Sequence, residues 1–314
     1  MSQLITPKGH YLGCKPDLPD QRDFVFAVAK IAAVPAVLPP NADLRASCPP
    51  IYEQGALGSC TANALGADFD IVRFGEGLPF MTPSRLFIYY NERVLEDTVS
   101  IDAGANLRDG IKVVAGQGVP QETIWPYDIS QFAVKPSDAV YTAAESNQAL
   151  VYERITPATL GDTTDMRSAL AAGLPFVSGI VVYQSFESQQ TVETGVVPLP
   201  AAGETMLGGH AVAVVGYDDA KQWFICRNSW GDSWGDRGHC YLPYSYLTNS
   251  QLAFDAWVIR TVELPPAPTP PTPTPPTPSP TPNPAPNPTP SPAPAPSSFW
   301  SQIANFFKRL FGLK

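Results

Sequence analysis

The chain has 314 residues, of which 44% are hydrophobic, so it is long enough for one sizeable core with appendages. Its formal net charge of −9 at pH 7 makes nucleic acid and anionic membranes poor electrostatic partners for most of the chain. The five cysteines include no CxxC pair, which disfavours a zinc site and a disulfide scaffold, and we expect neither a metal nor a cofactor.

Residues 1–40 form an irregular N-terminal segment, which we call the leader. Its short apolar clusters are interrupted by Pro and Gly, as in "CKPDLPDQRDFVF", so we expect it to lie against the rest of the protein. The chain shows no apolar h-region near its start and no apolar run of about 18 residues, so we predict neither a signal peptide nor a transmembrane segment. A cytoplasmic location and export without a signal peptide both remain open, with peripheral membrane attachment as a further option.

Residues 41–262 have the composition of a globular domain. In the first half, apolar residues recur every three or four positions, which predicts helices over 59–74, 82–96 and 106–118. The second half is rich in β-branched and aromatic residues, which predicts strands over 175–183, 210–218, 222–228, 238–244 and 254–264. Helices followed by strands predict an α+β fold of two packed halves.

Residues 263–298 are a proline-rich linker, followed by a basic amphipathic helix over 299–314. Prolines make up 18 of the 32 residues from 265 to 296, which favours an extended polyproline II conformation. The helix has an apolar face of Phe, Trp, Ile and Leu and carries Lys308, Arg309 and Lys314 with no acid. Three placements remain open for it: a membrane surface, a groove on a protein partner, or the acidic body of its own chain.

The stretch "EQGALGSCTANA" places a single thiol, Cys60, after a glycine-rich turn and in the first turn of a predicted helix. The unpaired N–H groups there stabilise a thiolate and lower the thiol pKa, as a nucleophile requires. The N–H of Cys60 and the side-chain amide of Gln54 are candidate donors to an oxyanion. The alternative is that Cys60 is simply a buried apolar residue.

Only three histidines are candidates for the base that would activate this thiol. His10 lies in the leader, and His239 lies in a predicted strand, where a structural role is expected. His210 begins the strand over 210–218. If the following turn is centred on Asp219, Val214 pairs with Phe224 and His210 lies opposite Asn228, whose amide oxygen would orient the imidazole.

The segments "QGALGSC", "GGHAVAVVGY" and "RNSWGDSWGDRGHCYLPY" together resemble the papain-like cysteine peptidases. "DLRASCPPIYEQGALGSCTANA" and "DLPDQRDF" resemble more closely the bacterial, xylellain-like group. The resemblance covers roughly residues 12–262, and His210 and Asn228 follow Cys60 by 150 and 168 residues. It implies a helical half and an antiparallel β half with the active-site cleft between them.

The resemblance also implies roles for individual residues. The catalytic set comprises the nucleophile Cys60, the base His210, the orienting Asn228 and the oxyanion donor Gln54. Trp230 would shield the His–Asn hydrogen bond from water. Ser59 and Gly209, the neighbours of the nucleophile and the base, are the other supporting residues.

These observations predict a monomeric cysteine endopeptidase that cleaves polypeptides through a thioester acyl-enzyme and is partly restrained by its leader. A transpeptidase or glutamine deamidase with the same triad, or a non-catalytic peptide-binding module, are the alternatives. Cys226 and Cys240 fall on neighbouring predicted strands, and the alternatives for them are a disulfide or two buried free thiols. Cys14 would approach Cys60 if the leader crosses the cleft.

Overall fold

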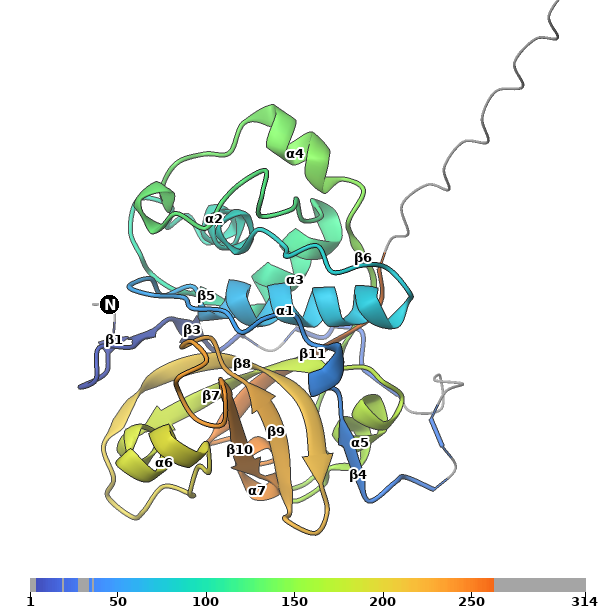
Figure 1. Ribbon diagram of the computed structural model, residues 1–314, viewed down its shortest axis with the longest axis vertical. Coiled ribbons are helices and arrows are strands. Elements are labelled where there is room, and N and C mark those ends of the chain that lie inside the picture. Colours follow the sequence, from blue (N-terminus) through green and yellow to red (C-terminus); the bar gives the residue numbers. More distant parts are fainter. Residues whose placement is uncertain (1–3, 19, 28–33, 36, 263–314) are drawn as a thin grey trace, which may run out of the picture. The chain divides into compact units, whose positions relative to one another are not determined.

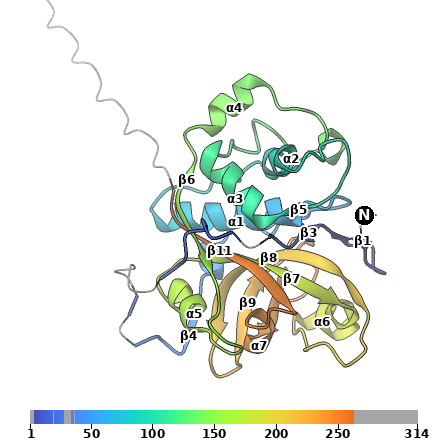
Figure 2. The same ribbon diagram turned by 180° about the vertical axis from the view of Figure 1, so that it is seen from behind.

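The computed structural model describes residues 4–18, 20–27, 34–35 and 37–262 (Figures 1 and 2). The predicted linker 263–298 and helix 299–314 lie outside the described residues, so the placements considered for them stay predictions. No helix in the described part combines the length and apolar character needed to cross a bilayer.

The upper half of the molecule in Figure 1 is helical. The side chain of Ser84 caps the start of α2 by accepting from Phe87 N, and Asn106 caps α3 by accepting from Asp109 N. These caps explain why both helices begin where their apolar periodicity begins. The elements are α1 (Cys60–Gly75), α2 (Arg85–Leu95), β5 (Ala105–Asn106), α3 (Leu107–Gly116) and α4 (Asp138–Ala144).

The lower half is built on an antiparallel sheet with the strand order β10-β9-β8-β7-β11-β6, and β4 pairs with β8 off this path. Together with the helical half, it confirms the predicted α+β class. The strands are β4 (Asn41–Asp43), β6 (Ala149–Ile155), β7 (Phe176–Tyr183), β8 (Met206–Asp218), β9 (Trp223–Arg227), β10 (His239–Pro243) and β11 (Ala253–Val262).

Several elements of this sheet region were not predicted, namely β4, β6, α5 (Thr164–Ala171), α6 (Gln189–Thr194) and α7 (Tyr244–Leu247). The three helices are short, so each offers little periodicity to detect. Local caps stabilise α6 instead: Ser188 accepts from Thr191 N at its start, and Gly195 ends the helix at a φ of 72°.

The central strand β8 is buried on both faces over most of its length. One face packs under α1, where its alanines and Val215 join the core of the helical half. The other face contributes Val212 and Val214 to a second core, lined by the remaining strands and α5 to α7. The sheet therefore separates two hydrophobic cores, which explains the nearly continuous apolar sequence of this strand.

The predicted register of the β8–β9 hairpin is wrong. Val214 pairs with Cys226 rather than Phe224, and a bulge between Val214 and Gly216 shifts the rest of the ladder. The register before the bulge is displaced by two residues, so side chains keep the face predicted for them, since alternation has a period of two. This is why His210 and Asn228 still lie on one side of the sheet, although they are not directly opposite.

Cys226 and Cys240 are direct cross-strand partners on β9 and β10, and both are buried free thiols.

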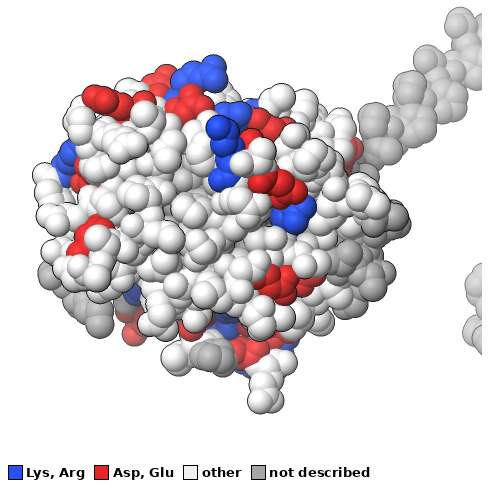
Figure 3. Space-filling view, turned by 90° about the horizontal axis from the view of Figure 1, so that it is seen from below, with Lys and Arg blue, Asp and Glu red and all other residues white. Residues whose placement is uncertain are grey.

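His239 begins β10, where its Nδ1 lies 3.1 Å from the carbonyl oxygen of Arg237. On the face shown in Figure 3, acidic and basic side chains are interspersed among a larger uncharged surface.

The leader crosses between the helical half and the sheet in both ribbon views (dark blue in Figures 1 and 2). A small hairpin joins β1 (Leu4–Ile5) to β2 (Tyr11–Leu12), and β3 (Cys14–Lys15) then pairs in parallel with β5. The leader therefore pairs through its backbone with the helical half, and at Val25 it also pairs with Arg154 on β6 of the sheet.

Candidate active site

Cys60 is the first residue of α1 and is fully buried. Burial raises the pKa of its thiol to about 12, and hydrogen bonds from the backbone N–H groups of Gly13, Ala211 and Thr61 offset part of this shift. Thr61 follows it in the first turn of α1, Ala211 follows His210 on β8, and Gly13 belongs to the leader. The sulfur therefore lies where the helix, the central strand and the leader meet.

The imidazole of His210 is held by Asn228, with 2.7 Å between Nε2 and Oδ1. Asn228 Oδ1 also accepts from the backbone N–H of Ser229 at 2.8 Å, which identifies it as the acceptor and Nε2 as the donor. In a neutral imidazole this leaves the Nδ1 lone pair free, and Nδ1 is buried without a hydrogen-bond partner among the described residues. His210 is thus arranged to accept a proton at Nδ1.

Trp230 covers this pair. Its ring centroid lies 4.7 Å from that of His210, with 33° between the two planes, and the residue is buried. Trp234 packs behind it, 5.2 Å away and edge-on, as part of the core. Burial lowers the pKa of His210 to about 4, against the opposing effect of the hydrogen bond to Asn228.

The amide of Gln54 is oriented by Ser229, a residue for which no role was predicted. Ser229 Oγ donates to Gln54 Oε1 at 2.7 Å, which turns Nε2 towards Leu57 O at 2.9 Å and the leader's Tyr11 O at 3.1 Å. The Tyr127 hydroxyl holds the backbone by donating to Gln54 O at 2.9 Å. No role was predicted from the sequence for either Ser229 or Tyr127.

The predicted supporting residues Ser59 and Gly209 have different neighbours. Ser59 Oγ lies 2.5 Å from the Tyr127 hydroxyl, and Asn63 Nδ2 donates to Ser59 O at 2.9 Å. A Cβ on Gly209 would lie 2.2 Å from the carbonyl oxygen of Cys14. Glycine at this position therefore leaves the room that the leader occupies.

The leader lies directly over the thiol. A Cβ on Gly13 would lie 1.9 Å from the carbonyl oxygen of Gly58, and one on Gly104 would lie 2.0 Å from that of Gly13. Ala105 N donates to Gly13 O at 2.8 Å. Cys14 is buried in the same core cluster as Cys60, and burial followed by the charge of Cys60 raises its thiol pKa.

The leader also covers Trp230. The ring of His10 stacks on it with a centroid distance of 4.1 Å and an interplanar angle of 1°. His10 Nδ1 lies 2.5 Å from Glu187 Oε1, whose side chain is 4% exposed. This histidine, for which the sequence indicated no role, anchors the leader beside the candidate base.

The thiol pKa was expected to be lowered, but it is raised in this structure, in which the leader covers Cys60. With the leader in place, burial raises the pKa of Cys60 and lowers the pKa of His210, so it disfavours the charged form of each. The helix start and the backbone N–H groups favour the thiolate, but desolvation outweighs them.

Comparisons with known proteins identify the relatives of this chain. The pattern of the papain family cysteine proteases matches residues 101–255. A peptidase C1-like protein of Acanthamoeba polyphaga mimivirus is 39% identical over 77% of this chain and 76% of its own length. The crystal structure of xylellain, a cysteine protease from Xylella fastidiosa, is 42% identical, covers 80% of this chain and 96% of its own, and superposes with a TM-score of 0.72.

A more distant structure, proCathepsin B S9 from Trypanosoma congolense, shares 15% identity and a TM-score of 0.60 over 78% of this chain and 84% of its own, which shows a shared fold.

Proposed function

Because the chain belongs to the papain family of cysteine proteases, we propose that it is an endopeptidase whose catalytic residues are Cys60, His210, Asn228 and Gln54. One observation carries this assignment. The hydrogen bond from His210 to Asn228 leaves Nδ1 of the imidazole unpaired, while the neighbouring residue Ala211 contacts the buried thiol at the start of α1.

The proposed reaction is acyl transfer. Cys60 gives its proton to Nδ1 of His210, and its sulfur attacks the carbonyl carbon of a peptide bond. The N–H of Cys60 and Nε2 of Gln54 donate to the resulting oxyanion. His210 then protonates the departing amine, and a thioester remains. A water molecule, deprotonated by His210, attacks the thioester and releases the acid, which restores the thiol.

The other polar groups position these atoms. Asn228 keeps the proton on Nε2 of His210 and so directs the lone pair of Nδ1 to the reaction. Trp230 excludes water from that hydrogen bond, which strengthens it because the surroundings are of low polarity. Ser229 holds the amide of Gln54 with its donor towards the cleft.

The leader restrains this activity in our proposal. The carbonyl of Tyr11 accepts from Gln54 Nε2, the backbone of Gly13 contacts the thiol, and His10 covers Trp230. A polypeptide substrate needs the same positions, so it competes with the leader for the cleft. Displacement or trimming of the leader would relieve the restraint.

Hydrolysis of a randomised peptide library tests the proposal, with products identified by mass spectrometry. We expect Cys60→Ala and His210→Ala to abolish cleavage and Asn228→Ala to leave a reduced rate. Retention of full activity by Cys60→Ala would contradict the assignment. Products joined to an added amine would indicate a transpeptidase, and Gln converted to Glu would indicate a deamidase. A library bound but left intact by the unsubstituted protein would indicate a peptide-binding module.

A further inference from the structure

Beyond the catalytic groups, two arginines of the body hold carboxylates of the leader. Arg108, on α3, binds both oxygens of Asp23, with Nε to Oδ1 at 3.1 Å and Nη2 to Oδ2 at 2.7 Å. Its Nη1 donates to the carbonyl oxygen of Leu18 at 2.7 Å. Within the described part of the chain, the hydrogen bonds of the Arg108 side chain all go to the leader.

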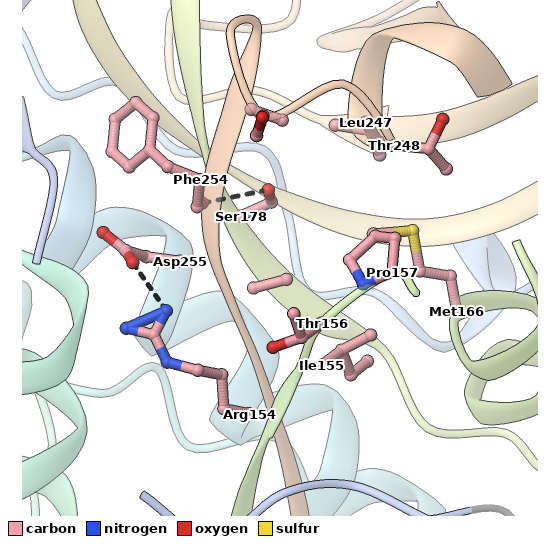
Figure 4. A pocket seen from close by; sticks show the side chains of 13 residues that line it. Arg154, Ile155, Thr156, Pro157, Met166, Ser178, Leu247, Thr248, Phe254 and Asp255 are labelled. Carbon is pink, nitrogen blue, oxygen red and sulfur yellow. Dashed lines mark hydrogen bonds and ion pairs between the residues drawn. The ribbon is translucent and has the colours of Figure 1, made fainter. Parts of the chain in front are cut away.

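Arg154, on β6, completes the site. Its Nη2 donates to Asp17 Oδ2 at 2.9 Å and its Nε to Asp23 Oδ2 at 3.0 Å. The body fixes this guanidinium independently: Nη1 donates to Asp255 Oδ1 at 2.6 Å (Figure 4), and the group lies 4.8 Å from the ring centroid of Trp257. Two of its donors therefore remain aimed at the leader.

Asp17 fills this site imperfectly. The Asp17 side chain is 1% exposed, yet its Oδ1 is buried without a hydrogen-bond partner among the described residues. Burial and the nearby charge of Asp255 raise the pKa of Asp17 to about 6. Without the leader, two guanidinium groups would face one carboxylate, Asp255. Such partly buried cations favour a replacement anion, and the guanidinium fork binds carboxylates in a bidentate manner.

The position of this site relative to the thiol follows from the leader. Asp17 comes four residues after Gly13, so at about 3.3 Å per residue it lies within about 13 Å of the residue that contacts Cys60. The intervening strand β3 pairs with β5, and α3 with Arg108 follows β5 directly. The preceding part of the leader lies instead on Trp230, beside His210.

The chemistry then orients a substrate. Because His210 protonates the departing amine, the C-terminal part of a substrate leaves on the side of His210 and Trp230. The N-terminal part therefore lies along β5, towards Arg108 and Arg154.

We propose that Arg108 and Arg154 form a binding site for acidic side chains of the polypeptide substrate, within about four residues upstream of the scissile bond. In the closed protein, Asp17 and Asp23 of the leader occupy this site. The inference rests on the proposed function, because it concerns substrate selection in the same cleft.

The test uses the full chain with Asp17→Asn and Asp23→Asn, which removes the leader's two negative charges from the arginines at nearly unchanged side-chain size. Two dye-labelled octapeptide libraries carry either Glu or Gln at their first two positions and are randomised at the other six. Binding is measured by fluorescence anisotropy on a form that also carries Cys60→Ala. We expect the Glu library to bind about tenfold more tightly, and Arg108→Gln to remove the preference.

Arg237→Gln is the matched control, because Arg237 is 86% exposed and forms its ion pair with its neighbour Asp236. It should leave the preference intact. Arg108→Lys keeps the positive charge but loses the planar, bidentate guanidinium group, so it should retain only part of the preference for the Glu library. This variant covers the case in which Arg108→Gln does not fold. Adding Gly13→Ala covers the case in which the leader stays in place.

Equal binding of both libraries, or a preference unaffected by both Arg108 variants, would overturn the proposal. The same libraries are then incubated with the form that retains Cys60. Preferential binding without cleavage would leave this site standing and refute the endopeptidase function. Cleavage of both libraries at equal kcat/KM would refute this site and leave the function standing.

Discussion

The substitution Gly13→Ala should convert the closed protein into a more active one. A Cβ at this position would lie 1.9 Å from the carbonyl oxygen and 2.6 Å from the carbonyl carbon of Gly58. Both atoms belong to the backbone just before Cys60, so neither can rotate away as a side chain would. The leader segment must lift instead, and with it the backbone that covers the thiol.

The size of the effect follows from the hydrogen bonds that hold this part of the leader. Lifting Gly13 removes its carbonyl from Ala105 N, at 2.8 Å, and moves the Tyr11 carbonyl from Gln54 Nε2, at 3.1 Å. Each such hydrogen bond contributes about 1 kcal/mol net, and overpacking costs about 1–3 kcal/mol. The closed state either keeps the overpacked contact or gives up the two hydrogen bonds, so it loses the smaller cost, about 1–2 kcal/mol, which raises the open population roughly 5-fold to 30-fold.

The assay is the initial rate of hydrolysis of a labelled polypeptide by the full chain, together with the rate at which a thiol-directed epoxide labels Cys60. Both rates should rise by the same factor, because both require the open state. Gly75→Ala is the control, since a Cβ there meets no atom within 4 Å, and it should change neither rate. A folded Gly13→Ala protein with unchanged rates would show that the leader does not restrain the site.

Three further predictions concern the polar groups. Because burial raises the Cys60 pKa to about 12, iodoacetamide should label the closed protein slowly at pH 8 and faster at higher pH; a rate independent of pH would contradict this. Ser229→Ala frees the amide of Gln54 and should lower kcat about tenfold with little change in KM, so a change confined to KM would count against its positioning role. Burial, followed by the charges of Arg227 and Arg45, lowers the pKa of His239 from 6.5 to about 4. Between these two pH values the unfolded chain takes up a proton that the folded chain does not, so the free energy of unfolding decreases as the pH is lowered. His239→Gln should remove up to about 1.4 kcal/mol per pH unit of that decrease. The unfolding free energy is measured by urea denaturation at several pH values between 6.5 and 4, and an equal dependence on pH in both proteins would refute the prediction.

The elements that bear the candidate site were predictable from local patterns. The run of small and apolar residues after Cys60 marks α1, and the β-branched run after His210 marks β8, because both depend on neighbours within a few positions. The family resemblance was likewise carried by short segments, and the comparisons confirm it. The pairing of His210 with Asn228 followed from side-chain alternation, although the register used to reach it was wrong.

The tertiary structure alone decided the path of the leader and the protonation of the site. The leader fits because Gly13, Gly104 and Gly209, which are far apart in the sequence, let backbones approach where a Cβ would collide. The bulge in β8 and the seating of leader carboxylates on arginines of α3 and β6 are likewise long-range contacts. Desolvation depends on everything packed around a group, so the sequence predicted a lowered thiol pKa at Cys60, whereas burial in the closed fold raises it.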